Sequence, residues 1–84
     1  MDDWLLAARA RIAQTVGEDA SAYDLSDDDV QTLLSLSGDA AHDSVRTNAP
    51  LVSYLAGLAV GRSGAVSLAD VAAAARGFRP DSTG

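Results

Sequence analysis

The stretch from Pro50 to Arg62, PLVSYLAGLAVGR, constrains the fold more than any other part of the chain. It carries no charged residue before Arg62, so a helix made of it has no obvious solvent face. A helix that is apolar all round is normally buried by its neighbours, and about 20 residues are needed to cross a bilayer, more than this stretch offers. The sequence therefore predicts an all-α domain, a compact bundle of about four helices around a buried apolar central helix from Ala49 to Arg62.

Two faces of this central helix are expected to pack differently. The first is an apolar stripe of three leucines, Leu51, Leu55 and Leu58. On the second, Ser53, Gly57 and Gly61 recur every four residues, a spacing that lets another backbone approach closely in membrane helix pairs. We therefore expect Gly57 and Gly61 to be helix-packing positions. Pro50 falls in the first turn, where its missing N–H does no harm.

Length, charge and cysteine content exclude several classes of protein. The 84 residues suffice for one domain, expected over residues 1–78, followed by a disordered tail at 79–84. There is no cysteine, which excludes disulfides and thiolate metal sites. The formal net charge of −6 argues against a nucleic-acid partner, because phosphate binding requires a basic patch. Neither a signal peptide nor a membrane span is visible, so the expected location is the cytoplasm.

The first helix is predicted from Asp3 to Val16, with Asp2 or Asp3 as its N-cap and Gly17 at its end. Its apolar residues fall at helical spacing: Trp4, Leu5, Ala8, Ile12 and Val16. We interpret Trp4 as a lid over one end of the core. Residues 18–25 form a polar connection to the second helix.

The second and last helices share one pattern at their starts. Ser26 is followed three residues later by Asp29, and Ser67 by Asp70, which in each case predicts a capped N-terminus. The second helix is expected to continue across Gly38 to about Arg46, because one apolar stripe stays in phase throughout.

Asn48 is expected to cap the central helix, which ends around Arg62 to Gly64. Gly77 is expected to end the last helix, and Phe78 to fold back as a plug.

The single histidine, His42, is the only residue that titrates near neutrality without help. Three interpretations of its surroundings remain open. His42 and Arg46 belong to a surface cluster of helical pairs with Asp39 and Asp43, or they bind the turn between the two long helices, or they form a small anion site to which Arg62 contributes. The ligand-binding candidates are therefore His42, Arg46 and Arg62.

Catalytic chemistry finds no support in the residues. Ser44 lies only two positions from His42, on another side of the helix, and no nucleophile-elbow motif is present. One histidine without cysteine is a poor metal-ligand set. Gly57 and Gly61 do not form a phosphate loop, because no strand precedes them. We expect no catalytic residue, no metal and no cofactor.

Three segments together carry a resemblance to a known family: DAAHDSVR at 39–46, APL at 49–51 and YLAGLAVGR at 54–62. With the early Trp4-Leu5 pair, the chain resembles a small bacterial family of helical domains of unknown function. Those domains are often fused to the C-terminus of molybdenum-cofactor guanylyltransferase-like proteins, or encoded beside them and formate dehydrogenase accessory genes. One departure is that Thr47 stands where the family tends to have proline after the arginine.

The resemblance implies an association with molybdenum cofactor biosynthesis rather than an activity of the chain itself. His42, Arg46 and Pro50 match family-typical positions that carry no known role. We therefore expect a non-catalytic accessory or interaction domain whose partner is a guanylyltransferase-like protein or a second copy of the chain. The alternative is a small module that binds an anionic ligand through His42 and Arg46.

Overall fold

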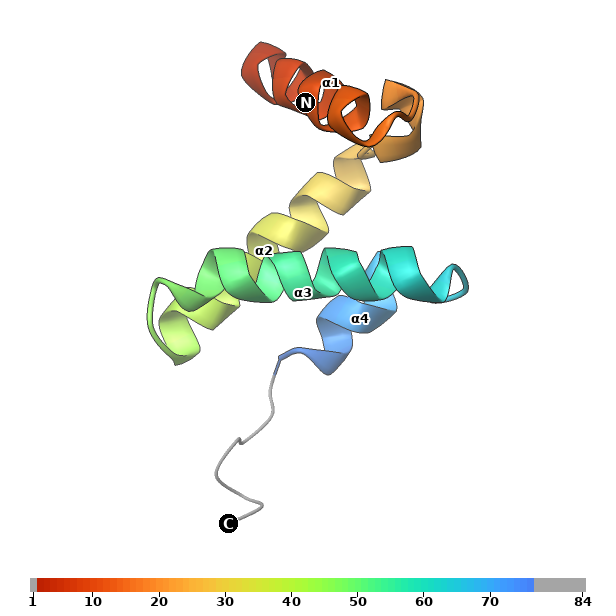
Figure 1. Cartoon of the computed structure of the whole chain (residues 1–84). Helices are drawn as coiled ribbons and strands as arrows, with labels where there is room; N and C mark the ends of the chain where they lie inside the picture. The colour runs from red at the N-terminus through yellow and green to blue at the C-terminus, as the bar shows by residue number, and fades with distance from the viewer. Residues whose placement is uncertain (1, 77–84) are drawn as a thin grey trace. The chain divides into compact units, whose positions relative to one another are not determined.

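A computed structural model describes residues 2–76, and all the regular secondary structure in that range is helical (Figure 1). The elements follow one another as α1 (Asp3–Val16), a short 3-10 helix η1 (Ala20–Tyr23), α2 (Asp27–Asp43), α3 (Asn48–Ser63) and α4 (Leu68–Ala74). The prediction of an all-α domain with four helices is confirmed. The Phe78 plug and the tail expected at 79–84 lie outside the described residues.

The chain divides into two units, Met1–Val30 and Gln31–Gly84. The first holds α1, η1 and the first turn of α2, and the second holds the rest of α2 with α3 and α4.

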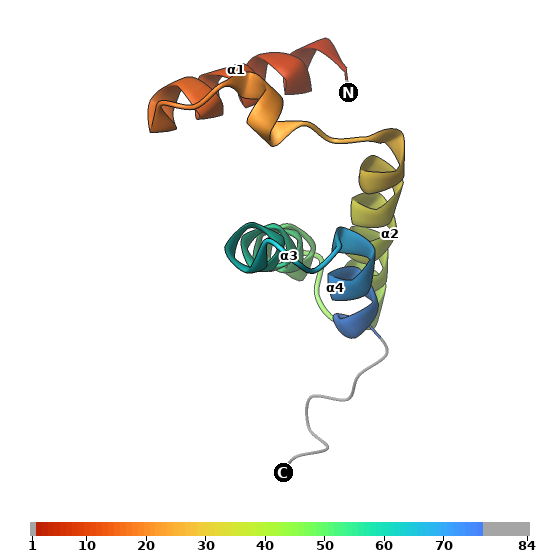
Figure 2. The same cartoon turned by 90° about the vertical axis from the view of Figure 1, so that its right-hand side faces the viewer.

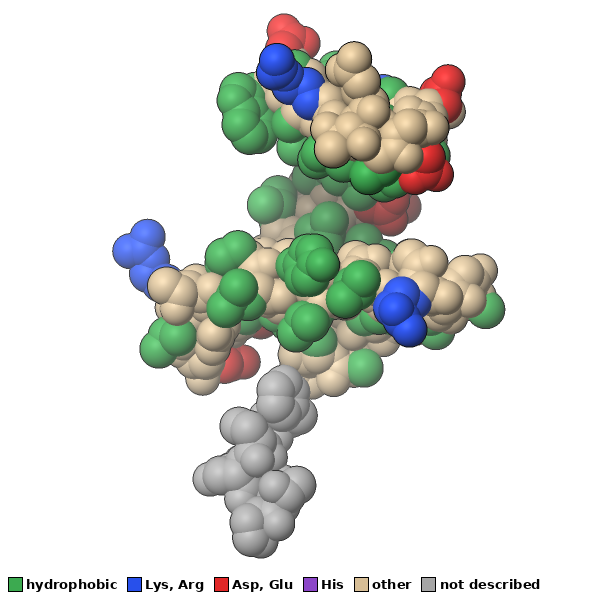
Figure 3. Space-filling model, viewed as in Figure 1, with side chains coloured by type: hydrophobic (Ala, Val, Ile, Leu, Met, Phe, Trp, Pro, Cys, Tyr) green, Lys and Arg blue, Asp and Glu red, His purple; other side chains and the backbone are tan. Residues whose placement is uncertain are grey.

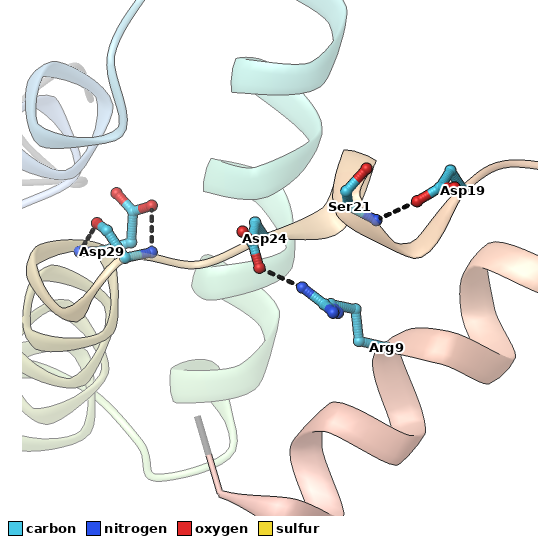
Figure 4. Close-up of polar contacts among 6 residues, drawn as sticks. Arg9, Asp19, Ser21, Asp24 and Asp29 are labelled. Atoms are coloured by element: carbon cyan, nitrogen blue, oxygen red, sulfur yellow. Dashed lines mark hydrogen bonds and ion pairs between the residues drawn. The ribbon is translucent and has the colours of Figure 1, made fainter.

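The predicted N-caps of α1, α2 and α4 are present and explain where these helices begin. Asp2 accepts a hydrogen bond from the Leu5 amide at 2.7 Å at the start of α1, and Gly17 ends that helix in the left-handed region at φ 75°. Ser26 and Asp29 bond reciprocally at the start of α2, with each side chain accepting the other's backbone N–H at 3.0 and 3.2 Å (Figure 4). This reciprocal pair satisfies two amides that would otherwise lack partners at the helix start.

Helix α2 runs unbroken through Gly38, as predicted, but it ends at Asp43 rather than Arg46. Two side-chain hydrogen bonds lie at this end of the helix. The Ser44 hydroxyl donates to the Ala40 carbonyl at 2.5 Å, and the Asn48 side-chain amide donates to the same hydroxyl at 3.1 Å. Asn48 is therefore not a cap. It is the first residue of α3, and the cap position, Thr47, makes no side-chain bond.

The other ends of α3 and α4 agree in part with prediction. Helix α3 ends at Ser63, followed by Gly64 at φ 69°, and Pro50 lies in its first turn as expected. Ser67 caps α4 by accepting the Asp70 amide at 3.1 Å. Helix α4 stops at Ala74 instead of reaching Gly77, and the amide of Ala75 turns back to the carbonyls of Val71 and Ala72.

In the N-terminal unit, η1 packs on α1 and buries Ala13. Arg9 of α1 forms an ion pair with Asp24, which follows η1 (Figure 4). The expectation that Trp4 covers the core is wrong, because Trp4 is 76% exposed. Within this unit η1 packs on α1 and leaves Trp4 and Ile12 exposed.

In the C-terminal unit, α2, α3 and α4 meet at a small core. Its buried residues come one from each helix: Leu36, Ala56 and Ala72. Four partly buried residues pack around them: Val52, Leu68, Val71 and Ala75. Helix α3 crosses α2 rather than running along it (Figures 1 and 2), and the hydroxyls of Ser37 and Ser53 share a hydrogen bond of 2.7 Å between the two helices.

The expectation that α3 is buried on all sides is wrong. Only Ala56 is fully buried, whereas Tyr54 is 67% and Leu55 60% exposed. The reason is the amount of chain available to cover α3. In the C-terminal unit it is packed by α2 and by a seven-residue α4, and two helices lying on one side leave the opposite side open.

Candidate functional site

The three ligand-binding candidates do not converge on one site. Arg46 precedes α3 and Arg62 lies near its C-terminus, so about 14 residues of helix, or about 20 Å, separate them. His42 lies near the end of α2, 89% exposed at its side chain, and its Nδ1 atom is 3.2 Å from the Asp43 carboxylate. This geometry does not favour an anion site shared by His42, Arg46 and Arg62.

The charged pairs around His42 also differ from those predicted. His42 contacts Asp43 rather than Asp39, and Asp39 instead lies 3.6 Å from the Arg76 guanidinium beyond α4. The predicted Asp43–Arg46 helical pair is not formed, because α2 has already ended at Asp43 and Arg46 lies in the following turn.

Gly57 and Gly61 do not pack against another helix in the part of the chain that is described. A Cβ atom built on either glycine meets no heavy atom within 4 Å beyond its own stretch of helix. The cause is helical geometry. Each step of four residues turns the helix about 40° past a full revolution, so Ser53 can face α2 while Gly57 and Gly61 turn progressively away from it.

The feature that stands out in this unit is a row of exposed apolar side chains along α3, which we call the outer face. It consists of four exposed apolar residues, Leu51, Tyr54, Leu55 and Leu58. Hydrophobic side chains gather along this helix in the space-filling view, with a basic side chain toward each end (Figure 3). Contiguous exposed apolar surface of this kind commonly marks an interaction site in a monomeric protein.

The outer face is not predicted from the sequence, because a fully buried helix would show the same uncharged apolar stretch. The uncharged stretch before Arg62 predicts a helix that is buried within its own chain. Hydrophobic periodicity reports that a surface avoids water, and it does not report whether the covering group is part of the same chain.

The groups with shifted pKa values lie around η1 and belong to local turn structure. Hydrogen bonds from Ser21, first from its backbone N–H and then from its side chain, hold the pKa of Asp19 below its ordinary value (Figure 4). The Tyr23 hydroxyl donates to Glu18, and this bond raises the pKa of Tyr23. Both groups are exposed, so these shifts fit turn stabilisation better than acid–base catalysis.

No three His, Asp or Glu side chains of residues 2–76 lie close enough together to hold a metal ion. Among the same residues, no helix combines the length and the apolar character that crossing a membrane requires.

Comparison with known proteins supplies the family. A model for a domain of unknown function, DUF6457, matches residues 1–81. The chain belongs to this family. The match spans all the helices of this DUF6457 domain, so the outer face of α3 and the caps described above lie within the family's extent. No curated protein and no solved structure matches the DUF6457 domain.

Proposed function

We propose that this DUF6457 domain is a non-catalytic interaction module that acts in the cytoplasm on a molybdenum-cofactor guanylyltransferase-like protein. The observation that carries the interaction role is the exposed outer face of α3, with Tyr54 67% and Leu51 59% exposed. The identity of the partner rests on the sequence resemblance described above.

The physical argument for a protein partner is the free energy that would be gained by burying the exposed apolar surface of the outer face. Burial of apolar surface contributes about 25 cal/mol per Å² removed from water. Aromatic side chains dominate the energetics of many interfaces, and the exposed Tyr54 offers both an apolar ring and a polar hydroxyl. A helix of the partner laid along α3 would bury this surface without desolvating a charge, since no ionisable acid or base lies between Pro50 and Arg62 apart from the Tyr54 phenol.

The proposal is tested with two substitutions on the outer face, Tyr54→Asp and Leu58→Asp. Both side chains are exposed, so the variants are expected to keep their helical circular-dichroism signal. Leu34→Asp is the matched control, because Leu34 is 62% exposed on α2 and lies outside the outer face. Binding is measured by isothermal titration calorimetry against the guanylyltransferase-like protein of the same organism.

We expect the two outer-face variants to weaken binding by about tenfold or more, as a buried charge would, and Leu34→Asp to leave it unchanged. Wild-type protein that does not bind, or variants that all bind equally, would refute the proposal. Sedimentation of the protein alone over a range of concentrations shows whether a second copy covers the outer face instead.

A further inference from the structure

A pocket of about 350 Å³ lies where the C-terminal half of α2, the N-terminal half of α3 and the end of α4 meet. Its apolar wall includes Leu51, Val52 and Leu55 of α3. Two carboxylates one helical turn apart on α2, Asp39 and Asp43, belong to its polar wall. The volume falls at the lower end of the range for ligand pockets, which suits one long side chain and part of a neighbouring residue.

The two carboxylates differ in the positively charged groups that lie beside them. Asp39 lies 3.6 Å from the guanidinium of Arg76, which also lines the pocket. Asp43 has only the exposed ring of His42 beside it, at 3.2 Å. The chain therefore already holds one guanidinium against one carboxylate here, while the second carboxylate has no arginine partner among residues 2–76.

We propose that this pocket receives an arginine side chain from the partner protein, with its aliphatic stem on Leu51 and Leu55 and its guanidinium at Asp43. This inference rests on the proposed interaction function and names the chemistry of one partner residue. Long basic side chains lie along apolar surface while their charged end reaches a polar group. The planar guanidinium also matches a carboxylate through two parallel hydrogen bonds, which a lysine ammonium cannot form.

The charge of the domain supports a basic rather than an acidic occupant. The chain has 12 acidic and 6 basic residues, and a partner segment with an arginine would be attracted to it at long range. An acidic occupant would meet Asp43 at close range, where like charges repel, whereas Arg76 already lies against Asp39.

The test titrates the isotopically labelled full chain with three capped tripeptides and follows amide signals by nuclear magnetic resonance. The peptides are Leu-Arg-Leu, its neutral isostere Leu-citrulline-Leu, and Leu-Glu-Leu. We expect saturable shifts with Leu-Arg-Leu, centred on residues 39–44 and 51–55, that weaken as salt is added. The citrulline and glutamate peptides are expected to bind more weakly.

Two variants that each remove one acidic charge show where the arginine peptide binds. Asp43→Asn removes the proposed partner of the guanidinium, and Asp28→Asn removes an acid from the first turn of the same helix, outside the pocket. We expect Asp43→Asn to weaken binding of Leu-Arg-Leu by about threefold, within the range for an exposed ion pair, and Asp28→Asn to leave it unchanged.

Equal weakening by both variants would overturn the proposal, because it would mean general attraction to an acidic surface. The proposal would also be overturned if the citrulline peptide bound as tightly as the arginine peptide. It would likewise be overturned if ethylguanidine bound as tightly as the arginine peptide, because that result would indicate a site for a small cation. Tyr54 and Leu58 do not line the pocket, so failure here is separable from failure of the outer-face test.

Discussion

Replacing Leu36 with alanine tests the core that holds the C-terminal unit together. Leu36 is 0% exposed and is the one large, fully buried side chain in the described part of the chain. Its buried neighbours are the small residues Ala56 and Ala72, which have no flexible side chain to move into the space left behind. Leucine-to-alanine changes in cores cost about 2–5 kcal/mol, and we expect about 3 kcal/mol here.

That loss is large compared with the stability of a chain of 84 residues. At about 0.05–0.15 kcal/mol per residue, a domain of this size has about 4–13 kcal/mol of stability in total. For domains of 60–100 residues, 1 kcal/mol corresponds to about 4–8 °C in the melting temperature. Leu36→Ala should therefore lower the melting temperature by about 12–24 °C.

The matched control is Leu34→Ala, two residues away on the same helix. Leu34 is 62% exposed, so the same chemical change removes little packing. Both substitutions alter helix propensity equally, and the difference between them reports burial alone. Thermal melts and urea titrations followed by circular dichroism at 222 nm measure both variants, and Leu34→Ala should stay within about 0.5 kcal/mol of the wild type. If Leu36→Ala lost no more stability than Leu34→Ala, the three-helix core described here would be wrong.

Three further predictions concern α3, the turn at η1 and metal dependence. Gly57→Ala and Gly61→Ala should each raise stability by up to about 1 kcal/mol, because alanine favours the helix and its Cβ meets open space; a loss in urea titrations would mean that a neighbour packs there. In a Tyr54→Phe background, the pKa of Tyr23 followed by tyrosinate absorbance should lie above 10.0, and Glu18→Gln should lower it. Because the pKa of Tyr23 is raised in the folded state, the Tyr23–Glu18 hydrogen bond stabilises the fold fully at pH values below the ordinary tyrosine pKa. This stabilisation is lost as the pH rises through the pKa of Tyr23 in the folded protein. A Tyr23 pKa that does not change in Glu18→Gln would contradict the prediction. A chelator should leave the helical circular-dichroism signal unchanged, because one imidazole and no thiol make a poor structural metal site; a collapse of the signal would show the opposite.

Helix starts could be predicted from sequence because they depend on contacts within four residues. Asp2 bonds the Leu5 amide, and Ser26 exchanges bonds with Asp29, whatever the rest of the chain does. Gly17 ends α1 for an equally local reason, since it adopts a positive φ that other residues avoid. The end of α2 was harder to predict because Ser44 bonds back to Ala40, an interaction open to any serine in a helix and therefore weakly informative.

The candidate sites could not be predicted because they depend on which segments meet. The pairing of Asp39 with Arg76 joins residues 37 positions apart, and no local rule indicates it. The pocket beside Asp43 likewise requires α2, α3 and the end of α4 to come together. Spacing along the predicted second helix pairs His42 with Arg46, but it cannot show whether Arg62 of the next helix joins them, and α3 itself keeps the two arginines apart.

The sequence by itself determined that the chain is helical, where most helices start, and that residues 50–61 carry no charge. Only the tertiary structure decided which side of α3 is buried. All sides of this helix are apolar, so periodicity could not choose among them. The choice follows from size: Ser53 and Ala56 are small enough for α3 to cross close to α2, and this contact leaves Tyr54 and Leu58 pointing outward.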